Sequence, residues 1–494
     1  MTNLSRSSVS AAKWSSLSAF FRLLLQFGAQ VVLARILGPE NYGVFAIGLV
    51  ITTFSTFVSN FGLGQGLLFR KTITDEDVRF AFTWQLVAGV LMTALMWWFA
   101  AEIAGFFHEP RAEWVIQWLS LTCVLGAATS SANSLAQRQM KFKQLGMSQL
   151  ASHALAYLVF GIPLALLGYG YHALVAVSLV QVLTLGLATY RLSRHSLRPL
   201  FRYGDAKTSL TYGALLFATN LLNWIPNNLA KMVVGRVMSP ASLGIYSTGY
   251  NVATIPNGLI VNSLQPVLNA VGSRMQENDQ RFAKALREVL GAVWVLGLPV
   301  CIAVAAGAKE VVAVLYGARW HGVDLVLVPM LLAMPAVVTS GLSTPLLWGS
   351  GRRHWEALAQ VPVVIATGGI LGGLAWAGRL DIATAAWATA GILVGRMVLL
   401  LAATLYTLRI PPGQFLDGLV RGALIGLVPL LAFGAVRALM PSVPPLVTLL
   451  SAWTLSLLPV LLAVATRPRL LGEPALECVG RFFPRLGRYI RRSG

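Results

Sequence analysis

A short pattern that occurs twice constrains this chain more than any other feature. The first copy is Leu33–Phe45 and the second is Val234–Tyr246; Arg, Pro, Gly and an aromatic residue fall in register, 201 residues apart. Each copy ends one apolar run and opens the next. The proline stops a helix there, and we expect the glycine to free the turn. A duplication at this distance predicts a chain built of two related halves.

The apolar runs predict a membrane protein. Of the 494 residues, 56% are hydrophobic and only 11% are charged. Runs of about 20 apolar residues recur along the chain, which is the length of a helix that crosses a bilayer, whereas a barrel shows short alternating segments. The first run starts near Ala12 without a cleavage site, so we expect it to be retained as a helix. The three cysteines, Cys123, Cys301 and Cys478, form no disulfide framework.

The predicted fold is an all-α polytopic membrane protein of fourteen transmembrane helices. Two parallel six-helix repeats are followed by two C-terminal helices, because an even number of spans makes both halves enter from the same side. The expected parts are an N-terminal bundle, a C-terminal bundle, two extra helices and a basic tail, at residues 1–195, 196–410, 411–466 and 467–494. The expected spans are 12–36, 43–68, 80–104, 114–136, 146–168, 171–190, 210–236, 243–269, 289–307, 324–348, 355–377, 382–408, 417–440 and 445–466.

The basic residues predict the orientation. The formal net charge is +20, and 28 of the 38 Lys and Arg fall on the two tails and on alternate loops. Such a bias marks the cytoplasmic side and argues against a nucleic-acid partner, so we expect both termini inside, facing anionic lipid. The segment Arg274–Glu288 and the basic tail are expected to lie on the inner surface. Cysteines introduced at positions 110 and 318 should react with an impermeant reagent on intact cells, and those at 200 and 280 should not; labelling at 200 would contradict this orientation.

Polar residues within the spans are the candidates for a substrate site. Charges inside a span are costly and usually face a bundle interior or a wet cavity. Arg22, Gln26 and Gln30 share one face of the first span by their spacing. The offset of 201 places Asn223, Asn227 and Lys231 in register with them. The full set of candidate substrate-binding residues is Arg22, Gln26, Gln30, Asn220, Asn223, Asn227, Lys231, Asn262, Gln265 and Arg396.

Some of these residues have a second interpretation. The Asn and Gln side chains suit interhelical hydrogen bonds as well as they suit substrate contact. Arg35 and Arg236 end their spans near the outer surface, where they can bind the last carbonyls of a helix. His153 lies within a span and can be protonated, although a single histidine there is more often a packing residue.

The acidic residues point to an anionic substrate. All 18 Asp and Glu fall in loops or near span ends; those nearest the lipid are Glu102, Glu310, Asp324, Glu356, Asp381 and Asp417. A cavity with fixed positive charge and no central acid prefers an anion, and lipid diphosphates are the largest sugar-bearing anions that cross a membrane. Metal-ligand spacing, a nucleotide loop and a nucleophile motif are all missing from the sequence. We therefore expect no metal, no cofactor and no enzyme activity.

The segment Leu33–Phe45 resembles the first hairpin of Wzx-type oligosaccharide flippases, which belong to the multidrug/oligosaccharidyl-lipid/polysaccharide exporter superfamily. The span count, the two halves and the stretch Tyr316–Trp320 are similar too. The resemblance is closest to the exopolysaccharide branch, such as the colanic acid or xanthan proteins. It implies flipping of undecaprenyl-diphosphate-linked repeat units across the bacterial inner membrane, by alternating access around a cationic cavity. It also implies a polysaccharide polymerase and co-polymerase as partners.

Two other functions stay open at this point. A cation-coupled drug exporter of the same superfamily should carry a buried Asp or Glu for its cation. A polysaccharide polymerase or ligase needs a sizeable outer loop with catalytic groups, whereas the predicted outer loops here are short. Neighbouring genes for glycosyltransferases and a polymerase would favour the flippase.

Overall fold

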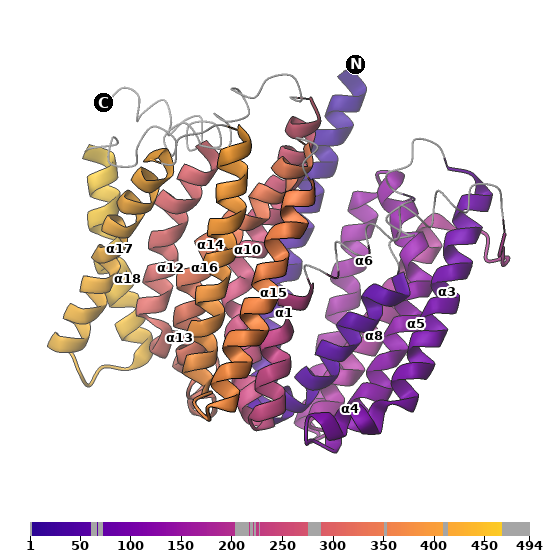
Figure 1. The fold of residues 1–494 in the computed structure, drawn as a ribbon, viewed down its shortest axis with the longest axis horizontal. Coiled ribbons are helices and arrows are strands. Elements are labelled where there is room, and N and C mark those ends of the chain that lie inside the picture. Colours follow the sequence, from indigo (N-terminus) through magenta and orange to yellow (C-terminus); the bar gives the residue numbers. More distant parts are fainter. Residues whose placement is uncertain are drawn as a thin grey trace. The chain divides into compact units, whose positions relative to one another are not determined.

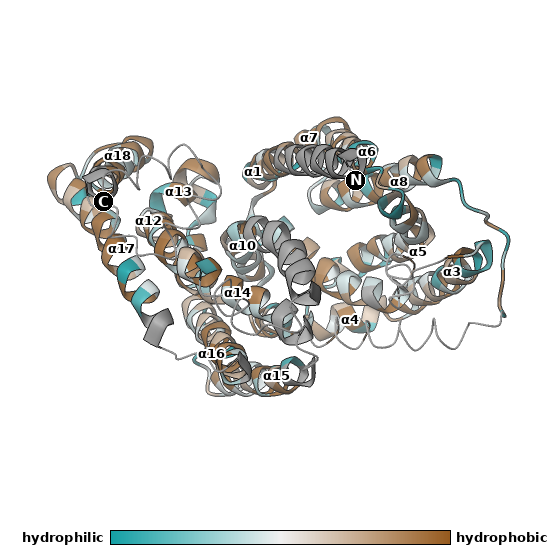
Figure 2. Cartoon of the chain, turned by 90° about the horizontal axis from the view of Figure 1, so that it is seen from above, coloured by the Kyte–Doolittle hydropathy of each residue, from teal (hydrophilic) through white to brown (hydrophobic). Residues whose placement is uncertain are grey.

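The computed structural model describes residues 2–60, 67, 73–202, 217, 221, 224–226, 228–274, 288–349, 353–408 and 413–466. Within these ranges the regular structure is entirely helical, which confirms the all-α prediction (Figure 1). Ten of the described helices are long and apolar enough to cross a membrane, and Pro445–Leu461 is a shorter apolar helix. Figure 2 shows apolar residues along the labelled helices. The chain is a multi-pass membrane protein; the count of fourteen and the repeat arrangement stay predictions.

The chain divides into two compact units, Met1–Gly244 and Ile245–Gly494. The four segments expected from the sequence are not tested by this division and stay predictions. In the first unit α5 packs against α1, α3 and α8. The elements of this unit are α1 (Thr2–Asn60), α3 (Asp75–Trp98), α4 (Ala100–Phe106), α5 (Arg111–Arg138), α6 (Phe142–Ala154), η1 (Leu155–Gly161), α7 (Ile162–Leu166) and α8 (Tyr171–Ser193), with a further helical stretch at 228–237.

In the second unit α14 packs against α16, and α17 packs against α12 and α18. Its elements are α10 (Pro240–Arg274, whose first turn belongs to the first unit), η2 (Val293–Gly297), α12 (Leu298–Ala306), α13 (Ala308–Leu315), η3 (Ala318–Trp320), α14 (Val323–Gly349), α15 (Arg353–Trp376), α16 (Ile382–Leu408), α17 (Gly413–Leu439) and α18 (Pro445–Thr466). The interfacial segment expected at 274–288 and the basic tail lie almost wholly outside the described residues.

Helix starts and breaks follow from local sequence. Thr74 and Asp77 form a reciprocal capping box at the start of α3, which satisfies two backbone donors. The turn in the first copy of the repeated pattern comes from Gly38. Its φ of 74° is a backbone conformation that glycine adopts readily because it has no Cβ atom. In η1 and η2 the helix widens to π-helical turns just before Pro163 and Pro299, because a proline supplies no backbone donor to the turn before it.

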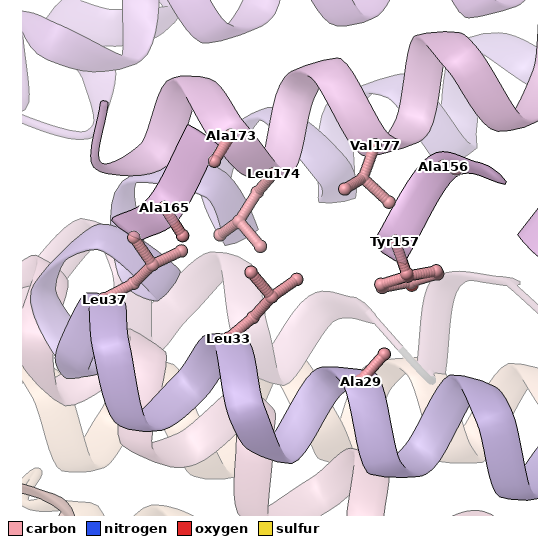
Figure 3. Packing of buried hydrophobic residues seen from close by; sticks show 9 residues of the cluster. All are labelled: Ala29, Leu33, Leu37, Ala156, Tyr157, Ala165, Ala173, Leu174 and Val177. Atoms are coloured by element: carbon pink, nitrogen blue, oxygen red, sulfur yellow. The ribbon is translucent and has the colours of Figure 1, made fainter. Parts of the chain in front are cut away.

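One apolar face of α1 packs against η1, α7 and α8 in the first unit. Its members recur at every fourth residue, so they line up along the helix (Figure 3). Leu33 is fully buried in this cluster. The labelled residues are Ala29, Leu33 and Leu37 of α1, with Ala156, Tyr157, Ala165, Ala173, Leu174 and Val177 of η1, α7 and α8. The packing fixes which face of α1 is left for polar side chains.

The two copies of the repeated pattern contact each other reciprocally. A Cβ atom on Gly43 would lie 1.7 Å from the carbonyl oxygen of Pro240, and one on Gly244 would lie 2.0 Å from that of Pro39. Both glycines are helical. The expectation that the repeated glycine frees the turn is therefore wrong: Gly43 and Gly244 allow two backbones to approach, because no side chain fits between them.

An ion pair joins α13 to α17 in the second unit. Glu310 accepts two hydrogen bonds from Arg437, at 2.8 and 2.7 Å. Burial alone raises the pKa of Glu310, but the hydrogen bonds and the charge of Arg437 outweigh it and hold this pKa below its usual value. A lowered carboxyl pKa adds stability above the unfolded-state pKa, and this is lost as the pH falls through the folded-state pKa.

We therefore expect Glu310→Gln to lower the free energy of unfolding by about 1 kcal/mol at neutral pH, a value reduced for the partial exposure of Arg437. The difference between wild type and variant should disappear in acid, below the usual pKa of a glutamate. Thermal unfolding of the purified protein at several pH values measures both effects. A difference that persists in acid would contradict the assignment to the ion pair.

Candidate substrate site

Arg22 lies on α1 beside two polar residues of α6. Its side chain is half-buried, and its Nη1 donates a hydrogen bond to Oε1 of Gln149. One turn further along α6, Nδ1 of His153 lies 2.8 Å from the backbone carbonyl oxygen of Gln149. His153 is only 6% exposed, and its ring stacks on that of Tyr157. The first unit thus brings a cation, an amide and an imidazole together at one level of α1.

The two glutamines predicted to share this face are half-buried. The backbone carbonyl oxygen of Gln30 accepts a hydrogen bond of 3.1 Å from the hydroxyl of Tyr42. Gln149 was missed by the sequence reasoning. The four-residue spacing of Gln149 and His153 in the fifth predicted span was the signal that would have found it, because it places both side chains on one helix face.

Lys231 is described in the helical stretch 228–237, where it is half-buried. Further along the chain toward the N-terminus, Trp224 Nε1 lies 3.3 Å from Thr53 Oγ1 of α1, and its ring is 5.1 Å from that of Phe54. The predicted partners Asn220, Asn223 and Asn227 lie outside the described residues. The second polar face is therefore described only at Lys231, and the prediction that Arg22 and Lys231 face one cavity stays a prediction.

In the second unit, Arg396 is half-buried on α16. Its electrostatic neighbours are Glu356 at the start of α15 and Tyr250 on α10. Glu356 lies near a span end, as expected, but is buried to 4% exposure, and it accepts a hydrogen bond of 3.3 Å from Thr344. Arg396 thus has an acidic neighbour, in contrast to Arg22 and its neutral amide. The side chains of Asn262 and Gln265, on α10, lie outside the described part.

The side chain of Arg236 contacts aromatic rings within the first unit, which suits a structural role. Its guanidinium contacts the ring of His108, and it lies 5.2 Å above the ring of Phe106. These contacts join the end of the stretch 228–237 to the residues that follow α4. On the same unit, Arg111 binds Glu40 and Glu109, and its hydrogen bond lowers the pKa of Glu109.

A hollow lies at one end of the second unit. It has a volume of about 390 Å³ and is lined by α13, η3, the start of α14 and Pro445. Its charged groups have both signs, with Lys309 and Glu310 on one wall and Asp324 on another. No group of three or more potential metal ligands occurs among the residues that the structure describes. The group formed by Arg22, Gln149 and His153 is thus the better candidate for an anionic ligand.

The described helices define the class of protein, a polytopic membrane protein. The structure is similar to that of the lipid II flippase MurJ in an inward closed conformation, with a TM-score of 0.70 and 15% identity over 92% of this chain and 99% of that one. It is also similar to an inward-facing multidrug resistance MATE family transporter, with a TM-score of 0.56 and 13% identity over 79% of this chain and 94% of that one. At these identities the likeness shows the fold.

The sequence places the chain in a family. The profile of the family described as "Polysaccharide biosynthesis protein" matches residues 32–324, more than half of the chain, so the chain belongs to this family. The succinoglycan biosynthesis transport protein ExoT of Rhizobium meliloti is 27% identical over 72% of both chains. The lipopolysaccharide biosynthesis protein WzxC of Escherichia coli is 23% identical over 66% of both chains. The resemblance to Wzx-type proteins predicted from the repeated pattern is confirmed.

Proposed function

We propose that this protein flips undecaprenyl-diphosphate-linked oligosaccharide repeat units from the cytoplasmic to the periplasmic leaflet for polysaccharide export. It resides in the bacterial inner membrane with both termini in the cytoplasm, its fourteen helices form two parallel six-helix repeats and two extra helices, and a polymerase and co-polymerase take up the product. Relatives named for succinoglycan transport and teichuronic acid biosynthesis, and a fold shared with a lipid II flippase, support this substrate class.

One observation carries the proposal. Arg22 is half-buried on a membrane helix, and its hydrogen-bond partner Gln149 is a neutral amide. A neutral partner orients the guanidinium without cancelling its positive charge, so that charge is left to attract a ligand. Guanidinium groups bind phosphate oxygens in pairs, whereas an ammonium group such as that of Lys231 acts as a point charge. A diphosphate head group suits this arrangement.

Two observations bear on the other functions. A cation-coupled drug exporter needs an acid for its cation, and the buried Glu356 has Arg396 as an electrostatic neighbour, so a cation would compete with an arginine there. A polymerase or ligase needs an outer catalytic loop. The described connection between α4 and α5, residues 107–110, is short. We therefore rank the flippase first.

Deletion of the gene tests the proposal. We expect loss of the extracellular polymer and accumulation of lipid-linked repeat units on the cytoplasmic leaflet, both restored by the wild-type gene. Normal export in the deletion strain, with sensitivity to drugs instead, would support the drug exporter. Export of single repeat units without polymer would support the enzyme. Either result would overturn the flippase.

A further inference from the structure

Two polar residues of α6, Gln149 and His153, lie beside Arg22. We propose that Arg22, Gln149 and His153 form one site for a diphosphate group and that His153 takes up a proton when the group binds. This inference rests on the proposed function. It adds two residues of α6 to the predicted set of substrate-binding residues, and it predicts a dependence of binding on pH.

The hydrogen bond of His153 determines which ring nitrogen can accept a second proton. Nδ1 lies 2.8 Å from the carbonyl oxygen of Gln149. A carbonyl oxygen only accepts, so Nδ1 carries the hydrogen and the neutral ring has its lone pair on Nε2. A second proton then binds at Nε2, and the bond to Gln149 stays intact. The ring of Tyr157 lies nearly parallel to the imidazole, with 6.2 Å between the ring centroids.

Gln149 connects the two cationic groups. Its side-chain oxygen accepts from Arg22, and its backbone carbonyl accepts from His153. One residue thus orients both groups. Because Gln149 is neutral, it supplies no counter-charge to either of them. We treat it as a positioning residue, whose effect on binding passes through Arg22.

The charges around His153 set the sign of the coupling. Arg22, across the contact of α1 with α6, is the charge that acts on the ring, and Tyr157 is the titratable neighbour on η1. The other described titratable groups on the packed helices are Arg35, Glu40 and Tyr42 on α1, Arg111, Glu113, Cys123 and Arg138 on α5, Lys143 on α6, and Tyr171, His172, Tyr190 and Arg191 on α8.

While the site is empty, the burial of His153 and, to a smaller extent, the positive charge of Arg22 favour the neutral ring. When a diphosphate binds Arg22, its negative charge exceeds that of the guanidinium, and the field at the ring changes sign. One proton then passes from water to Nε2 and leaves when the anion leaves. At low pH the wild-type site must therefore bind the anion more tightly than a site whose residue 153 cannot take up a proton. At high pH the two affinities must become equal.

Calorimetry on the full-length purified protein tests the coupling. The probe is farnesyl diphosphate, a short polyprenyl diphosphate, titrated in buffers of different ionisation enthalpy to count protons taken up. The comparison is with His153→Asn, whose amide still donates to the Gln149 carbonyl but accepts no proton. We expect wild type to take up close to one proton more than the variant at neutral pH. We expect the variant to bind about tenfold more weakly near pH 6 and equally well near pH 9.

A second pair of variants tests the role of Gln149. Gln149→Glu places a carboxylate on Arg22 and should weaken binding at least about tenfold near neutral pH. Its control is Gln139→Glu, the same change at the exposed end of α5, which should bind as wild type does. Size-exclusion profiles and thermal unfolding identify variants that fail to fold, and His153→Gln replaces His153→Asn in that case.

The outcomes separate the two proposals. If wild type does not bind farnesyl diphosphate, the proposed function fails and this inference falls with it. If wild type binds, but the His153 variant takes up as many protons, the linkage is wrong and the flippase stands. If Gln149→Glu binds like Gln139→Glu, the positioning role is wrong.

Discussion

Replacing Arg22 by alanine should abolish polymer export, or reduce it to a small fraction of the wild-type level, while lipid-linked repeat units accumulate on the cytoplasmic side. A diphosphate carries about two negative charges, and moving such a group into hydrocarbon without compensation costs on the order of tens of kcal/mol. Arg22 is a half-buried cation on α1 whose described hydrogen bond goes to a neutral amide. Without it the site loses a charge that offsets the head group.

Matched variants separate charge from shape. Arg22→Lys should keep part of the activity, because it retains the charge and loses the paired hydrogen bonds. Lys231→Ala should also reduce export strongly. Arg35→Ala removes a cation from an exposed position further along the same helix and should do little harm. Export is compared at equal protein level in the membrane. Normal export by well-expressed Arg22→Ala and Lys231→Ala proteins would show that the cationic mechanism is wrong.

Much of the fold could be predicted because apolar run length is a local property. The expected spans 382–408 and 445–466 coincide with α16 and α18, and the turn at 168–170 lies between α7 and α8, where Gly168 and Gly170 have positive φ. The π-helical turns could not be predicted from run length. They depend on how the helix accommodates the missing donor of a proline, as at Pro163.

Less of the site could be predicted, because it depends on contacts between helices. Spacing places Arg22, Gln26 and Gln30 along one stripe of α1, but spacing along one helix says nothing about which neighbour faces it. Gln149 lies 127 residues further along the chain, so only the packing of α6 on α1 brings it to Arg22. The same limit applied to the repeated glycines: the duplication was visible, but the contact between its two copies was not.

Replacing Gly43 on α1 or Gly244 on α10 by alanine should destabilise the protein far more than the same change at Gly28 on α1. The added methyl group at Gly43 would lie 1.7 Å from the Pro240 carbonyl oxygen, and the one at Gly244 would lie 2.0 Å from the Pro39 carbonyl oxygen. The obstructing atoms belong to the backbone, so no rotation of a side chain relieves the overlap and the helices must separate. Overpacking of this kind costs about 3 kcal/mol or more.

The control is Gly28→Ala, since a Cβ at Gly28 meets nothing within 4 Å and the residue lies on the same helix. Alanine favours helix over glycine, so this variant should be as stable as wild type or slightly more so. We expect Gly43→Ala and Gly244→Ala to unfold at temperatures several degrees lower than Gly28→Ala and to accumulate less in the membrane. Because each glycine supports the same contact from opposite sides, the double variant should lose less than the sum of the two single losses. Equal unfolding temperatures for Gly43→Ala and Gly28→Ala would show that the two copies of the pattern do not pack as described.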